Sequence, residues 1–197
     1  MAIGAARGTG WREADLLVLD FEATSAEPRS ARPLSVGWVG IGDGRVRASE
    51  CGYAVVRHVD PVPAGALAVH GLTPDVVAAG RPPEEVRDEL GALLAGRVLV
   101  AHHAPLEVAL LKGWGLRPEA VLDTLALLRR LDERAGRPRA DVTLAGAARR
   151  FDVPAARAHH AFGDAWTTAL LLLGLVGDLE AERGGVSLDD LLRLGRT

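Results

Sequence analysis

The stretch that decides the fold is LLVLDFEAT, residues 16–24. Its first four residues are apolar, which is the pattern of a short buried strand, and the apolar run stops at Asp20. Asp20 and Glu22 are two residues apart, and side chains at that spacing in a strand point to the same side of the sheet. The stretch therefore predicts a central strand with two carboxylates at its end.

The flanking sequence predicts four more strands. Residues 33–41 and 46–56 favour two strands joined by a hairpin at Gly42-Asp43-Gly44, so three antiparallel strands are expected to open the fold. Two further apolar runs, at 97–101 and 121–123, predict strands that come later in the chain.

Helices are predicted where apolar residues recur at helical spacing or follow a helix-start signal. These segments are residues 83–94, 105–114, 124–134, 143–151, 161–179 and 188–194. Residues 61–82, rich in proline and glycine, predict a loop. Three strands followed by alternating strands and helices predict an α/β fold with a mixed five-stranded sheet and helices on both faces.

Length and composition favour one globular domain of a soluble protein. The 197 residues are 48% hydrophobic, which is enough to bury a core over 13–180, between a flexible tail at 1–12 and a C-terminal extension at 181–197 formed by one short helix. Cys51 is the single cysteine, so a disulfide framework is excluded and a cytoplasmic location is expected. No apolar run predicts a membrane span. The net charge of −3 excludes a strongly basic DNA binder, so any affinity for phosphate must be local.

The pair Asp20 and Glu22 is a candidate cation site. Two neighbouring carboxylates repel each other unless a cation lies close, and Mg²⁺ favours carboxylate oxygens and water. The spacing alone also fits a strand end that meets solvent. Asp178 and Glu180 repeat the spacing, but on a helix residues two apart do not face each other, so no function is expected there.

Two later segments could add to this pair. HHAPLE at 102–107 puts Glu107 in the first turn of a helix, where the helix dipole alone favours an acidic residue. HHAFGD at 159–164 puts a histidine five residues before Asp164, a polar residue in a mostly apolar helix. His70 and Asp75 have the same spacing, so a surface or capping role for either histidine stays open on spacing alone.

Taken in order, five segments resemble the DEDDh exonucleases, the family of polymerase proofreading subunits and related 3′-to-5′ nucleases with a ribonuclease H-like fold. They are VLDFEAT at 18–24, AVHGLTPDVV at 68–77, VLVAHHAPLEVALL at 98–111, VLDTLALLRRL at 121–131 and HHAFGDA at 159–165. The resemblance covers about residues 15–178.

The resemblance implies a role for each matching residue. Asp20, Glu22, Asp164 and, at the fourth position, Glu107 would hold two Mg²⁺ or Mn²⁺ ions. His159 would be the general base that takes a proton from the attacking water, and the product would be a nucleoside 5′-monophosphate. The candidate contacts to the terminal nucleotide are Phe21, Ala23, Thr24, His70, Leu72 and His103.

Glu107 departs from the family, which has aspartate there, and His103 stands where the family has asparagine. One extra methylene moves the carboxylate by about 1.5 Å, and Mg²⁺ tolerates little deviation from octahedral geometry. Glu107 could still bind through a water or favour Mn²⁺. We expect activity to survive in reduced form; the alternative is a catalytically weakened or inactive module that binds nucleic acid or a polymerase.

The expected partner is the 3′ end of a single-stranded nucleic acid, with DNA favoured over RNA. Association with a DNA polymerase and formation of a homodimer both stay open. A further alternative is a zinc site built from the histidine pairs at 102–103 and 159–160, since imidazole suits zinc.

Overall fold

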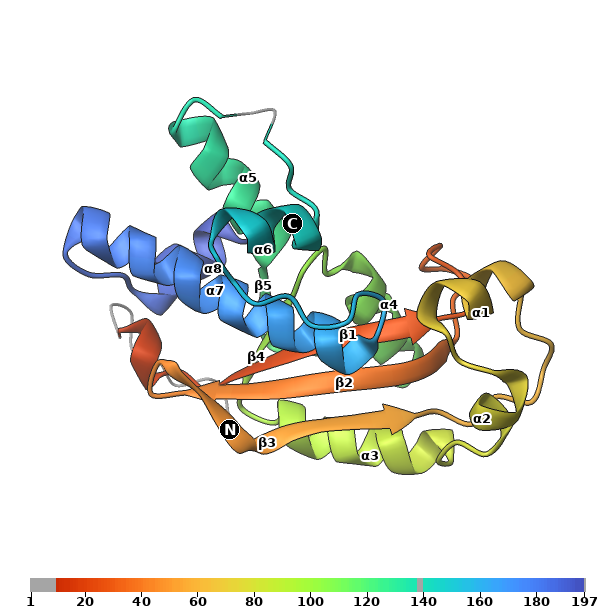
Figure 1. Cartoon of the computed structure of the whole chain (residues 1–197). Helices are drawn as coiled ribbons and strands as arrows, with labels where there is room; N and C mark the ends of the chain where they lie inside the picture. Colours follow the sequence, from red (N-terminus) through yellow and green to blue (C-terminus); the bar gives the residue numbers. More distant parts are fainter. Residues whose placement is uncertain (1–9, 138–139, 197) are drawn as a thin grey trace.

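The computed structural model describes residues 10–137 and 140–196. Within them one five-stranded sheet has the order β3-β2-β1-β4-β5 (Figure 1). Its strands are β1 (Leu16–Ala23), β2 (Pro33–Gly42), β3 (Arg45–Val55), β4 (Val98–Ala101) and β5 (Val121–Asp123). The first three strands are antiparallel, and β4 and β5 run parallel to β1, so the predicted mixed sheet is confirmed.

Helices cover both faces of this sheet, as predicted. The longest, α7 (Ala161–Arg183), lies across one face, and α3 (Pro83–Leu94) lies on the other (Figure 1). The remaining helices are α1 (Ala64–His70), α2 (Pro74–Ala78), α4 (Pro105–Gly113), α5 (Thr124–Arg134), α6 (Leu144–Arg150), α8 (Leu188–Leu194) and the 3-10 turn η1 (Trp11–Glu13).

The alternation of β1 decides which face receives the carboxylates. Leu16 and Val18 belong to the core cluster under α5, α6, α7 and α8, whereas Leu17 and Leu19 belong to the cluster under α3 and α4. Residues at even positions of β1 therefore point towards α7, since side chains alternate along a strand. Asp20 follows Leu16 and Val18 in this alternation and faces the same way.

β1 is longer than its apolar run predicts. The strand continues past Asp20 to Ala23, because its backbone keeps pairing with β2: Asp20 lies opposite Gly37, and Glu22 lies opposite Ser35. Both acidic residues are therefore held by the sheet and not by a loop. The backbone ladder fixes their positions, which hydrophobic pattern alone does not reveal.

The loop predicted over residues 61–82 is wrong in part, because α1 and α2 form there. α1 follows Pro63 and ends where Gly71 takes a left-handed conformation with φ 68°, while α2 has Pro74 in its first turn. Proline and glycine mark the helix boundaries here.

The two ends of the domain pack into its core. Trp11 is only 3% exposed, and its indole Nε1 donates to Glu180 Oε1 at 2.8 Å, so the tail prediction is wrong for residues 10–12; residues 1–9 lie outside the described part of the chain. The predicted C-terminal helix is confirmed as α8, whose Leu188, Leu191 and Leu194 belong to the same core cluster as Trp11.

By length and composition α7 is the one helix in the described residues apolar enough to cross a membrane, with a window of mean hydropathy 1.3. In this fold 56% of that window is buried inside the domain. Packing against the sheet therefore accounts for its apolar character.

Candidate active site

Three carboxylates meet above the centre of the sheet. Asp20 and Glu22 come from β1, and Asp164 comes from the first turn of α7. One oxygen of each lies within 4.8 Å of the others, close enough to hold one cation. In residues 10–137 and 140–196 this is the only group of three or more potential ligands found.

A glycine brings Asp164 to the strand. Gly37 on β2 lies directly opposite Asp20, and a Cβ built there would lie 2.3 Å from the Phe162 backbone. Real Cβ atoms do not approach backbone so closely, so α7 can begin at this point only because residue 37 has no side chain. The first turn of α7, which carries Asp164, thus lies directly on the sheet.

An aromatic contact fixes the start of the same helix. His160 is the N-cap of α7, and its Nδ1 accepts from Gly163 N at 3.4 Å. Its ring stacks on Tyr53 of β3, with the ring centres 4.6 Å apart. The side chain of His160 therefore serves a structural role at the helix start.

His159, in contrast to its neighbour His160, does not cap α7. Its backbone has φ 55°, an uncommon conformation for a residue with a side chain, and its backbone N donates to Asp164 Oδ2 at 2.8 Å. The imidazole is exposed and lines a cavity of about 390 Å³ together with Asp20 and Asp164. The proposed base and the proposed metal ligands therefore share one cavity.

Glu107 lies in the first turn of α4 and is not one of the three carboxylates whose oxygens lie within 4.8 Å of one another. It is 5% exposed, and its Oε2 has no hydrogen-bond partner in the described part of the chain. Burying an unpaired carboxylate is costly, so this oxygen calls for a cation or a proton. Its negative charge adds to the raised pKa of the Asp20 carboxyl.

Asp123, which the sequence analysis did not identify, holds the turn before α4. It is 1% exposed and accepts from His103 N at 2.9 Å and Ala104 N at 3.0 Å. It also caps α5 through Leu125 N. Its position at the end of a strand and the start of a helix was the available signal. Asp123 therefore positions the first turn of α4, which carries Glu107.

The electrostatics of the site favour the binding of divalent cations. Burial raises the pKa of Asp20 well above its ordinary value, and the charges of Glu107, Asp164 and Glu22 add to this. Burial also raises the pKa of Glu22 to about 7, that of Glu107 to about 8, and that of Asp164 in the same direction. Carboxylates are ligands that hard divalent ions prefer, so these residues fit the metal ions that the sequence analysis expects.

We predict that the metal-free protein loses stability as the pH rises towards 8. Glu22 and Glu107 titrate at about 7 and 8 in the fold, against an ordinary value of 4.5, so the folded state holds more protons than the unfolded state in between. The free energy of unfolding therefore falls with pH across this window. Burial lowers the pKa of His70 and His102, so their contribution makes the free energy of unfolding rise with pH. That contribution ends near pH 6.5, the ordinary pKa of histidine.

The check is thermal unfolding between pH 6.5 and 8, with EDTA and with Mg²⁺. The midpoint should fall with pH in EDTA and change less in Mg²⁺. A midpoint that rises with pH in EDTA would contradict the raised pKa values of Glu22 and Glu107.

A second cavity, of about 320 Å³, borders the group on the α1 side. It is lined by candidate substrate contacts among other residues, namely Phe21, Ala23, Thr24 and His70. Leu72 and His103 line neither this cavity nor the one beside His159. His70 is 5% exposed, and its ring nitrogens have no hydrogen-bond partner in the described residues.

The zinc hypothesis is wrong for the described residues. His102 Nδ1 lies 2.9 Å from Thr124 Oγ1, and its Nε2 lies 3.0 Å from Val142 O, so both nitrogens are engaged. His160 caps α7. In the described ranges, no group of potential metal ligands includes a histidine.

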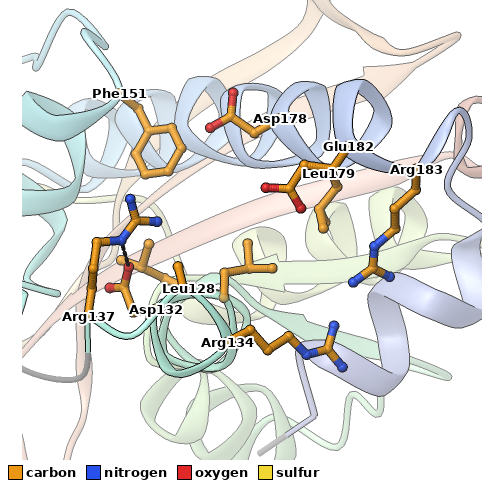
Figure 2. A pocket seen from close by; sticks show the side chains of 11 residues that line it. Leu128, Asp132, Arg134, Arg137, Phe151, Asp178, Leu179, Glu182 and Arg183 are labelled. Atoms are coloured by element: carbon orange, nitrogen blue, oxygen red, sulfur yellow. Dashed lines mark ion pairs between the residues drawn. The ribbon is translucent and has the colours of Figure 1, made fainter.

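A third cavity, of about 150 Å³, lies between α5 and α7 towards the C-terminal end of α7 (Figure 2). Its floor includes Leu128, Leu179 and Phe151. Its buried acid, Asp132, is paired with Arg150 at 2.5 Å and with Arg137 at 3.3 Å. The charge of Asp132 is thus already compensated, and the cavity is separate from the carboxylate group.

The fold and the carboxylate group point to one class of proteins, the exonucleases with a ribonuclease H-like fold. A family model, RNase_T, described as exonuclease, matches residues 17–172, and the chain belongs to this family. The DNA polymerase III subunit epsilon-like protein of Rhodobacter capsulatus is 30% identical over 202 residues, covering 91% of this chain and 27% of that protein.

Solved structures show the same fold. Exonuclease X in complex with 5′ overhanging duplex DNA has a TM-score of 0.70 and 22% identity, covering 91% of this chain and 99% of that one. Escherichia coli exonuclease I in complex with a dA16 oligonucleotide has a TM-score of 0.73 and 15% identity, covering 86% of this chain and 42% of that one. The chain spans about a quarter of the length of the Rhodobacter relative.

Proposed function

We propose that this protein is a metal-dependent 3′-to-5′ exonuclease that releases nucleoside 5′-monophosphates from single-stranded DNA. The observation that carries the proposal is the shared cavity, which is lined by Asp20, Asp164 and His159. In the described residues these carboxylates form no ion pair with arginine or lysine, and such a group beside an exposed imidazole suits hydrolysis of a phosphodiester by an activated water.

The carboxylate group would hold two Mg²⁺ or Mn²⁺ ions. Asp20, Glu22 and Asp164 offer oxygens within 4.8 Å of one another, and Glu107 offers a buried oxygen without a partner in the described residues. Bound there, such ions would lower the pKa of a water and offset the negative charge of the phosphate.

His159 would accept the proton of the attacking water. Imidazole is the side chain that gains and loses a proton near neutral pH, and that of His159 is solvent-exposed on the cavity wall. The bond from its backbone N to Asp164 Oδ2 holds base and ligand in fixed relation. This coupling supports the assignment of His159, and not His160, as the base.

The terminal nucleotide would occupy the second cavity. Its wall contains Phe21, Ala23 and Thr24 at the end of β1, directly beside Glu22. His70 also lines this cavity and would contact the nucleotide there. DNA is favoured over RNA because related proteins are named as parts of DNA polymerase III and related structures hold DNA.

The test of this function uses single strands labelled at the 5′ end, as DNA and as RNA of one sequence. Stepwise shortening that starts at the 3′ end, depends on metal, and is faster on DNA is the expected result. Internal cuts, or shortening from the labelled end, would contradict the proposed polarity.

The alternative of a weakened or inactive module rests on Glu107, whose carboxylate lies outside the group of three. We expect Glu107→Asp to retain turnover and to raise the rate in Mg²⁺ relative to Mn²⁺ severalfold, since the shorter side chain should suit the stricter geometry of Mg²⁺. The measurement is the initial rate in each metal. An unchanged ratio would show that residue 107 does not contribute to the metal site, and a wild type that binds strands without shortening them would favour the inactive module.

A further inference from the structure

Arg157 lies in the segment between α6 and α7, two residues before His159. Its backbone is held against the start of α7, because a Cβ on Gly163 would lie 2.5 Å from the carbonyl oxygen of Arg157. The first turn of the helix that carries Asp164 thus fixes the point from which this side chain extends.

The side chain of Arg157 reaches across to the end of α1. A Cβ on Gly71 would lie 2.8 Å from Arg157 Nη2, so the guanidinium rests on the glycine that follows His70. Gly71 has φ 68°, a conformation that glycine adopts without strain. Arg157 therefore connects the segment of the proposed base with the helix end beside the proposed nucleotide cavity.

The structure shows no hydrogen bond or ion pair between this guanidinium and any other described residue, and Arg157 is exposed. Elsewhere, arginines such as Arg47 and Arg150 pair directly with aspartates. The donors of Arg157 are therefore exposed and available, in a chain whose net charge is −3. A planar guanidinium binds two phosphate oxygens at once, which makes phosphate the ligand that fits.

We propose that Arg157 forms a phosphate subsite, which binds the non-bridging oxygens of the terminal phosphodiester and then the 5′-phosphate of the released nucleotide. The inference rests on the proposed exonuclease function and adds to it a substrate contact outside the metal ligands. Arg157 lines neither cavity itself, but its guanidinium rests on Gly71, next to His70 of the second cavity, and its backbone is two residues from His159 of the first.

Equilibrium binding separates this role from a structural one. Binding of thymidine 5′-monophosphate and of thymidine is measured by calorimetry in Mg²⁺, for wild type, Arg157→Ala, Arg157→Lys and Arg117→Ala. Arg117 is an exposed arginine in the connection between α4 and β5, and it provides the same change of charge away from the site.

Arg157→Ala should weaken binding of the monophosphate roughly tenfold or more and leave binding of thymidine unchanged. Arg157→Lys should be intermediate, and Arg117→Ala should match wild type. Equal losses for both ligands, or wild-type affinity of Arg157→Ala for the monophosphate, would overturn the inference, as would a wild type that does not bind the monophosphate. Because binding needs no turnover, a protein that binds as expected but never shortens a strand would refute the exonuclease proposal and leave the phosphate subsite standing.

Discussion

Asp20→Asn is expected to abolish turnover and to make the metal-free protein more stable. Asp20 is the carboxylate whose pKa is raised by burial and by three neighbouring acids, so removing its charge relieves repulsion in the fold. The same change removes a proposed metal ligand. Metal ions supply several kcal/mol to such reactions, so we expect a loss of about a thousandfold or more in kcat.

The matched control for this prediction is Asp178→Asn. Asp178 is an exposed acid on α7 that lines the third cavity, and the substitution is chemically identical. Turnover on a single-stranded DNA and the thermal midpoint in EDTA at pH 8 are compared for both variants. Substantial turnover by Asp20→Asn, or a lower midpoint than wild type, would contradict the assignment.

Gly37→Ala is expected to reduce turnover by about a hundredfold, although residue 37 touches no substrate in this account. The added methyl group would lie 2.3 Å from the backbone of Phe162, so the start of α7 must move and carry Asp164 away from Asp20. Crowding a packed site in this way costs about 1–3 kcal/mol of stability.

Gly177→Ala is the control for this helix. A Cβ at Gly177 would meet nothing within 4 Å, and alanine stabilises a helix interior relative to glycine by roughly 0.5–1 kcal/mol. Turnover and urea unfolding of the two variants are compared. Wild-type turnover by Gly37→Ala would show that the close approach of α7 to β2 does not position the site.

Much of the fold was predictable because apolar periodicity reports burial directly. The helices at 83–94 and 124–134 were predicted with the boundaries that the structure shows. β1 extends beyond its apolar run to Ala23, because its last residues are held by pairing with β2 and not by their own hydrophobicity. Trp11 is buried by residues near the other end of the chain, among them Leu188 and Leu191, which its local sequence does not reveal.

Some residues of the candidate site could likewise be predicted from the sequence, and others could not. Asp20, Glu22 and Asp164 were predicted from a strand pattern and a resemblance, and the structure brings them together. Gly37 and Arg157 carry no local signal, since their importance lies in contacts with Phe162 and Gly71, which are distant in the sequence. Such contacts require the three-dimensional arrangement.

The most direct test of the central claim is release of labelled mononucleotide from a single-stranded DNA labelled at its 3′ terminal nucleotide. Wild type, Asp20→Asn and His159→Ala are compared in Mg²⁺, in Mn²⁺ and in EDTA. Wild type is expected to release nucleoside 5′-monophosphate rapidly with either metal, with no release in EDTA or by Asp20→Asn, and His159→Ala is expected to lose about a hundredfold or more. Release by wild type in EDTA, or undiminished release by Asp20→Asn, would contradict the central claim.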